Sequence, residues 1–203
     1  MSFHLDKQSC LFYILLIFII YMAIKIYLDS DSYNLKCIIS DLDGEKYCVR
    51  ERSKLKDAAN LLAETTSKMK QLVDYVANKY PDNDDVKTLV KRFNPTKISE
   101  TLPTSEHTAY SENKGEKLAF CLNKHKNSDN KLIDPNTLLF VAIHELAHVM
   151  SNVEGHKQIF WQNFKFLLTE AKEAGIYVPV DYKKNPEPYC GMDITDNPYY
   201  DLV

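Results

Sequence analysis

A helix that is apolar on nearly every side, yet holds three ionisable side chains, is the feature that most constrains this chain. Residues 136–152 read NTLLFVAIHELAHVMSN, and a helix with this pattern must be buried. Asp134 is a good N-cap and Pro135 suits the first helical position, so the helix is expected to begin there. Burying two histidines and a glutamate without partners would cost several kcal/mol. The fold must therefore supply a partner for them.

The three polar side chains are His144, Glu145 and His148, in the pattern His-Glu-x-x-His. Residues four apart on a helix share one face, so both imidazoles can reach one metal ion at about 2.0–2.1 Å. Glu145 points beside that ion, where it can take a proton from a water molecule. The pattern predicts a Zn²⁺ site with Glu145 as the general base.

A third ligand is expected at His156. Gly155 can end the first helix in a left-handed cap, and a second helix is expected from His156 to Ala174, ended by Gly175. Its apolar stripe contains His156, Phe160, Phe164, Leu167 and Ala171. A histidine at the start of that stripe could meet the other two, leaving one metal position open for water, as in catalytic zinc sites. The alternative is a solvent-exposed histidine without a ligand role.

The N-terminal run at 11–28, LFYILLIFIIYMAIKIYL, predicts a membrane anchor. As a helix it spans about 27 Å, close to the hydrocarbon thickness of a bilayer. A cleaved signal peptide and a buried core helix are the alternatives, but the run is long and no clean small-x-small cleavage site follows. Lys7 precedes the span, whereas Lys25 and Lys36 lie at or after it. This small excess predicts a single-pass protein with its large C-terminal part in the cytoplasm.

Hydrophobic periodicity predicts an α+β fold for the rest of the chain. The expected elements are strands at 37–39 and 47–49, helices from about 53 to 80 and at 86–93, a loop at 94–115, a strand at 117–123 and an irregular tail at 179–203. The chain then divides into a tail at 1–10, the anchor at 11–28, a helical and hairpin region of open role at 29–116, and the metal-binding domain at 117–203.

Charge and cysteine content restrict the partners and the compartment. With 25 Lys+Arg against 28 Asp+Glu, the net charge is −3, so the chain lacks the broad positive field that direct nucleic-acid binding usually needs. The number of cysteines is odd, without a Cys-x-x-Cys pair, which does not predict a disulfide scaffold. Cys37 and Cys48 flank the expected hairpin and could pair or remain thiols. Cys190 is expected to be a buried thiol, with a regulatory metal ligand as the alternative.

The combination His-Glu-Leu-Ala-His at 144–148, Gly-His at 155–156 and Phe160 resembles the WLM and SprT-like zinc metallopeptidases of the zincin class. The likeness is closest to the WLM-like group, which includes forms from large DNA viruses. The matching stretches are KLAFCLN, LLFVAIHELAHVM, GHKQIFWQNFKFLL and GIYVPVDYKKNPEPYCGM. The resemblance implies a minimal zincin with an active-site helix, a short sheet over it and a second ligand-bearing helix. It also implies that an edge strand binds extended peptide, with 117–123 as the candidate.

Two residues of the tail have possible roles by analogy with zincins. Tyr189 could donate a hydrogen bond to the oxyanion, and Met192 could lie beneath the metal. Simple packing is the alternative for both side chains.

The sequence as a whole predicts a membrane-anchored zinc metallopeptidase that hydrolyses peptide bonds in a protein or peptide substrate. The alternative is a membrane-anchored structural or adaptor protein whose zinc-stabilised fold is inactive, although such a site would not need Glu145. A third possibility is a protease acting on nucleoprotein near membranes, because relatives in these families act on proteins crosslinked to DNA. Only their chemistry is carried over to this chain, since the span and the acidic balance do not fit that substrate.

Overall fold

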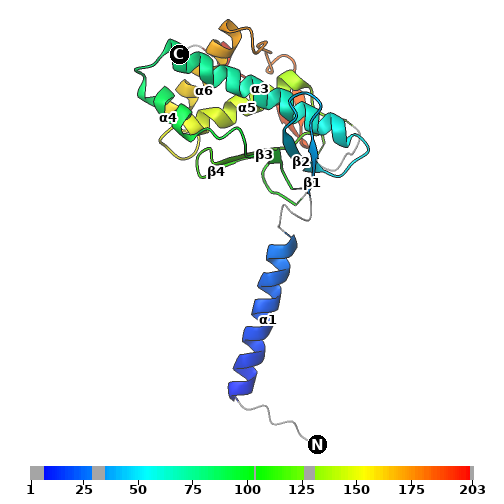
Figure 1. The fold of residues 1–203 in the computed structure, drawn as a ribbon. Helices are drawn as coiled ribbons and strands as arrows, with labels where there is room; N and C mark the ends of the chain where they lie inside the picture. Colours follow the sequence, from blue (N-terminus) through cyan, green and yellow to red (C-terminus); the bar gives the residue numbers. More distant parts are fainter. Residues whose placement is uncertain (1–6, 29–34, 103, 126–130, 202–203) are drawn as a thin grey trace, which may run out of the picture.

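The structure, a computed structural model, describes residues 7–28, 35–102, 104–125 and 131–201. The first residues of the expected tail, 1–6, and the start of the expected hairpin region, 29–34, lie outside these ranges. Helix α1 (Lys7–Leu28) includes the expected span and is drawn apart from the other elements in Figure 1. It is long and apolar enough to cross a membrane, and none of its window from Cys10 to Tyr27 is buried.

A five-stranded mixed sheet lies below the helices (Figure 1). Its strands are β1 (Leu35–Ile39), β2 (Lys46–Arg50), β3 (Ile98–Glu100), β4 (Ala109–Glu112) and β5 (Lys117–Phe120). Their order is β1-β2-β3-β5-β4, with parallel pairing of β3 to both β2 and β5 and antiparallel pairing at both ends.

The strands at 37–39 and 47–49 are confirmed, but two expectations about this sheet are wrong. The supposed loop at 94–115 contains β3 and β4, which are too short and too polar to show alternation in the sequence. The strand expected at 117–123 ends at Phe120 and lies inside the sheet, between β3 and β4. The edge strand at this end of the sheet is therefore β4, and β1 is the edge strand at the other end.

Four helices pack on one another. They are α3 (Leu55–Lys79), α4 (Asp84–Arg92), α5 (Pro135–Met150) and α6 (Gln158–Glu173). Helices α3 and α5 contact the sheet directly. Helix α5 is the centre of the core, because α3, α4 and α6 all contact it. Twelve of its residues are buried, as the all-round apolar pattern predicted.

The expected start of α5 is confirmed, whereas the connection to α6 differs from the prediction. Asp134 accepts a hydrogen bond from the Thr137 amide at 2.9 Å, which caps α5. The helix already ends at Met150, so Gly155, with φ +71°, lies in the following loop and is not the cap. His156 belongs to the same loop, because α6 begins only at Gln158.

The C-terminal segment, expected to be irregular, contains a second small sheet. Strands β6 (Glu187–Tyr189) and β7 (Met192–Ile194) form an antiparallel hairpin. Cys190 and Gly191 connect them with φ values of +52° and +84°, as a tight two-residue hairpin turn requires. The sequence signal was weak because a proline lies inside β6 and each strand has three residues.

Two disulfides join parts of this fold. Cys37 pairs with Cys48 across β1 and β2, which decides between the two alternatives left open for these residues. Cys121, just after β5, pairs with Cys190 in the β6–β7 turn. The expectation that Cys190 is a free thiol is therefore wrong.

The boundary expected between 116 and 117 passes through the β4–β5 hairpin. Strands from both sides of it form one sheet, and α3 packs directly on α5. Residues 35–116 thus supply four of the five strands and two of the three helices that contact α5.

Candidate metal centre and peptide groove

His144, Glu145, His148 and His156 come together at the C-terminal half of α5. His144 and His148 are one turn apart on α5, and His156 reaches them from the loop before α6. The ligand atoms of the three histidines all lie within 4.8 Å of one another. The structure thus brings together the three histidines proposed as ligands, although it places His156 two residues before the helix expected to carry it.

The spacing of the imidazole nitrogens fits a single zinc ion. Nε2 of His156 lies 3.1 Å from Nε2 of His148 and 3.1 Å from Nε2 of His144. Two nitrogens bound tetrahedrally at about 2.0–2.1 Å would be roughly 3.3 Å apart. Three neutral imidazoles with one further position for water or substrate are a common donor set for catalytic zinc. The three side chains present therefore fit the metal that the motif implies.

The electrostatic setting of the two helix-borne histidines also suits metal binding. Burial, followed by the nearby charges of the other two histidines, lowers the pKa of His144 to about 3. Burial and the charge of His156 lower the pKa of His148 to about 4. Both imidazoles are therefore neutral near pH 7, which is the form that binds a metal ion.

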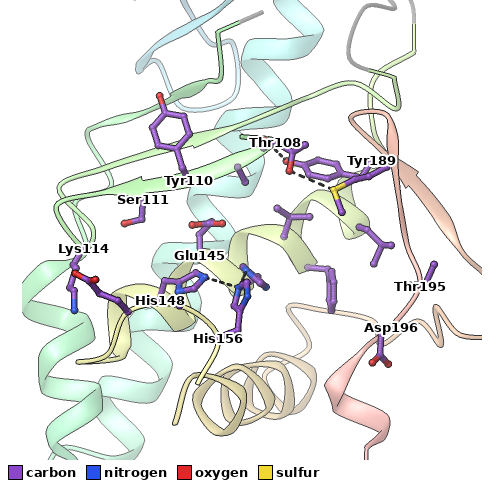
Figure 2. Close-up of a pocket in the computed structure, with 18 of the residues that line it drawn as sticks. Thr108, Tyr110, Ser111, Lys114, Glu145, His148, His156, Tyr189, Thr195 and Asp196 are labelled. Carbon is purple, nitrogen blue, oxygen red and sulfur yellow. Dashed lines mark hydrogen bonds between the residues drawn. The ribbon is translucent and has the colours of Figure 1, made fainter. Parts of the chain in front are cut away.

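Glu145 lies between the histidines and β4, with Tyr110 and Ser111 beyond it (Figure 2). It is only 6% exposed, and burial raises its pKa to about 8. A carboxyl group with a pKa near neutrality can accept and return a proton at physiological pH. Its position and its pKa therefore both fit the predicted role of general base.

Aromatic side chains of α6 support the histidine cluster from behind. Phe160 is fully buried, and its ring centroid lies 4.2 Å from that of His148 and 4.6 Å from that of His156. Phe164 lies 5.1 Å from His144 in an edge contact. The apolar stripe predicted on α6 is thus buried against the histidines. His156, predicted as the first residue of that stripe, lies just before the helix.

Trp161 is a supporting residue that the sequence analysis missed. Its Nε1–H donates to the backbone oxygen of His156 at 3.1 Å, and its ring centroid lies 5.5 Å from that imidazole. This contact restrains a ligand that is carried on a loop rather than on a helix. The sequence contains a single tryptophan, next to Phe160, which could have drawn attention to it. It lies outside the apolar stripe of the helix, and the stripe alone therefore predicted no role for it.

The histidines and Glu145 line the floor of a groove of ≈ 870 Å³. One wall is the edge strand β4 with the residues on either side of it, and β7 with the residues after it forms a second wall, which meets the first at Thr108. Figure 2 shows β4 above the histidines and the segment with Thr195 and Asp196 on the right. The edge strand offers backbone groups for pairing with another extended chain.

Tyr189 and Met192 both line this groove. The Tyr189 hydroxyl donates to the backbone oxygen of Thr108 at 3.0 Å, and burial raises its pKa above the usual range. This hydrogen bond joins the two walls of the groove. The hydroxyl therefore bonds to the backbone and does not point at the metal position. Met192 is 52% exposed and contacts the Thr108 hydroxyl, whereas a methionine beneath the ion would be buried.

Comparisons with known proteins give distant similarities. The chain is 28% identical over 162 residues to Uncharacterized protein R325 of Acanthamoeba polyphaga mimivirus, covering 78% of this chain and 81% of that protein. It is 42% identical over 57 residues to Uncharacterized protein 136R of Invertebrate iridescent virus 6, covering 28% and 32% of the two chains. No family model matches the sequence.

Among solved structures, the fold is similar to Wss1 from Saccharomyces cerevisiae. The TM-score is 0.47 with 18% sequence identity, and the match covers 63% of this chain and 89% of Wss1. Similarity at this level transfers no activity to the chain. The chemistry has to follow from the four side chains of the centre and from the groove above them.

Proposed function

We propose that this chain is a membrane-anchored zinc metallopeptidase that hydrolyses peptide bonds in the groove between β4 and β7. The observation that carries the proposal is the convergence of three imidazole nitrogens, with Glu145 beside them, on the floor of a groove with an edge strand. When bound, zinc would lower the pKa of a water molecule and polarise the substrate carbonyl. His144, His148 and His156 would hold the ion.

The protein's own groups would perform the proton transfers. Glu145, on the β4 side of the histidines, accepts a proton from the attacking water and then passes it to the leaving amine. Tyr189 keeps a hydroxyl proton within the same groove, and a role at the oxyanion would require that hydroxyl to leave Thr108.

The substrate would be an extended peptide lying along β4. This edge strand replaces residues 117–123, the candidate suggested by the sequence, because β5 already pairs on both sides. A peptide paired with β4 would lie directly above Glu145 and the histidines (Figure 2). A protein or peptide, rather than nucleic acid, fits this groove and the net charge of −3.

Exchanging Glu145 for glutamine tests the peptidase proposal. Full-length wild type and Glu145→Gln, each in detergent micelles with zinc, are incubated with casein. Loss of the general base should lower cleavage by about 10²–10⁴-fold, while zinc content stays the same. Glu51→Gln is the matched control, because its side chain is 78% exposed, and it should keep full activity. Equal cleavage by wild type and Glu145→Gln would refute the proposal.

The same experiment separates the enzyme from the structural or adaptor alternative. Zinc in both proteins with cleavage in neither would favour a zinc-stabilised but inactive domain. A second incubation with a DNA-bound protein tests the nucleoprotein alternative, which cleavage of that protein with casein left intact would favour.

The two disulfides bear on the orientation of the anchored domain. Disulfides persist in oxidising compartments and are rare in the cytosol, so they favour the non-cytosolic side of the membrane. The lysine distribution predicted the cytoplasmic side. Protease treatment of sealed vesicles with their cytosolic face outward decides between the two orientations. A domain on the non-cytosolic side is protected, whereas a domain on the cytoplasmic side is degraded.

A further inference from the structure

The two ends of the groove have different chemistry, and the fold fixes their direction. At one end Thr108, just before β4, contacts Tyr189 and Met192. At the other end Gly115, just after β4, lies against Val149 near the C-terminus of α5. The groove therefore runs along β4 and α5 together, and the histidines lie between its ends. Figure 2 shows this axis, with Lys114 at one side and Tyr189 and Thr195 at the other.

The end next to Tyr189 combines large apolar side chains with Thr195, Asp193 and Asp196. Phe140 and Val141 lie one helical turn before His144 and Glu145, on the face of α5 that lines the groove. They are 6% and 8% exposed, so they form a nearly closed floor. Across from them are Met192 and Ile194 of β7.

Met192 and Ile194 occupy alternate positions of β7, so their side chains point to the same face of the hairpin. Met192 is the more exposed of the two, with 52% of its surface accessible. A flexible thioether at the rim of an apolar recess is well suited to contact another apolar side chain. The opposite end of the groove is polar instead, with Ser111, Asn113, Lys114 and Glu154.

The pairing preference of β4 orients a bound peptide relative to these ends. Antiparallel pairing is slightly more favourable per residue than parallel pairing, and β4 already pairs antiparallel with β5. A peptide antiparallel to β4 runs from the Lys114 end towards the Thr108 end. Its residues before the cleaved bond then lie at the polar end, and the residue after that bond lies at the apolar end.

We propose that Met192 and Ile194, above Phe140 and Val141, form a specificity pocket for a large apolar side chain on the residue directly after the cleaved bond. The inference rests on the proposed peptidase function and adds a substrate class to it. Leucine, methionine and phenylalanine fit the apolar lining, whereas a carboxylate would lose its hydration there without gaining a partner.

Cleavage-site sequencing tests the pocket in the active protein. The full-length chain with zinc, in detergent micelles, digests a mixture of denatured peptides, and the new amino termini are identified by mass spectrometry. We expect leucine, methionine and phenylalanine to be enriched at the first position after the cut. Enrichment at the position before the cut, or at neither position, would overturn the proposal.

Changing the rim residue tests the assignment more closely. Met192→Glu alters a half-exposed side chain, so the variant should fold normally. Cleavage at bonds followed by leucine should fall at least tenfold relative to cleavage at bonds followed by lysine. Val178→Glu is the matched control, because Val178 is apolar, 70% exposed and not part of the groove lining. It should leave the preference unchanged. An unchanged preference in Met192→Glu would refute a role for this residue.

Peptide binding separates the pocket from the chemistry. Fluorescent peptides Ala-Ala-Gly-Xaa-Ala-Ala, with leucine or aspartate as Xaa, are titrated with zinc-loaded Glu145→Gln protein. We expect at least tenfold tighter binding of the leucine peptide, and loss of that difference when Met192→Glu is added. Equal affinity for the two peptides would overturn the pocket. Selective binding of the leucine peptide in a protein whose wild type cleaves nothing would retain the pocket and refute the peptidase.

Discussion

Replacing Cys121 and Cys190 together by serine removes the cross-link that holds the β7 wall of the groove to the end of β5. The two cysteines are 69 residues apart, and the loop they close contains all three histidines and Glu145. Chain-entropy arguments give about 4 kcal/mol for a loop of this length. The Cys37–Cys48 pair, with a separation of 11, should contribute about 3 kcal/mol.

Urea unfolding of the zinc-free, full-length proteins in micelles measures this contribution. With a slope of about 2 kcal/mol per molar urea, the midpoint should fall by roughly 2 M in the Cys121→Ser/Cys190→Ser protein. The β6–β7 turn would keep its two backbone bonds, Cys190 N–H to Asn123 O at 2.9 Å and Gly191 N–H to Lys124 O at 3.0 Å. The domain should therefore remain folded while the groove wall loosens and cleavage falls.

The matched control is the Cys37→Ser/Cys48→Ser protein, which loses the shorter loop far from the groove. It should be destabilised less and should keep the proposed peptidase activity. If removal of Cys121–Cys190 costs no more stability than removal of Cys37–Cys48, the assigned role of the longer cross-link is refuted. Unchanged cleavage would show that the β7 wall does not depend on it.

Three further predictions follow from single contacts. Burial raises the pKa of Glu145 to about 8 in the zinc-free protein, so its contribution to stability is full below about pH 4.5 and is lost as pH rises to 8. Glu145→Gln should therefore gain stability relative to wild type by roughly 1.4 kcal/mol per pH unit in that window, and a pH-independent difference in urea midpoints would contradict this. Gly115→Ala should destabilise the fold by about 1–3 kcal/mol from strain at φ +112° and by a similar amount from overpacking, because the added Cβ would lie 2.8 Å from the Arg92 backbone oxygen. Thermal unfolding checks this, and a wild-type-like midpoint would refute it. Trp161→Phe removes the donor to the His156 oxygen and should weaken zinc binding roughly 10-fold in a chelator competition, whereas unchanged affinity would show that the contact does not position the ligand.

The motif helix and the positions of its two histidines could be predicted because their determinants are local. Asp134 and Pro135 fix the start of α5, and the four-residue spacing of His144 and His148 places both on one face. His156 was identified from its proximity to an apolar stripe, yet it lies in the loop before α6. The sequence cannot distinguish the first turn of a helix from the residues just before it when no capping side chain is present, and Lys157 makes no such bond.

The walls of the groove could not be predicted, because they depend on pairing between distant segments. Strands β3 and β4 have three and four residues, and their positions follow from β2 and β5 rather than from their own pattern. The Cys121–Cys190 pairing crosses 69 residues, and spacing alone does not define disulfide connectivity. The edge proposed to bind a peptide was therefore assigned to β5, the strand that pairs with β4.

Zinc content of the purified full-length chain tests the central claim most directly. The account predicts about one zinc per chain in wild type and in Glu145→Gln, and almost none in a His144→Ala/His148→Ala protein that otherwise folds. Elemental analysis after exposure to zinc and removal of loosely bound metal gives the answer. A well-folded wild-type chain that retains no zinc, or equal zinc in the double variant, would contradict it.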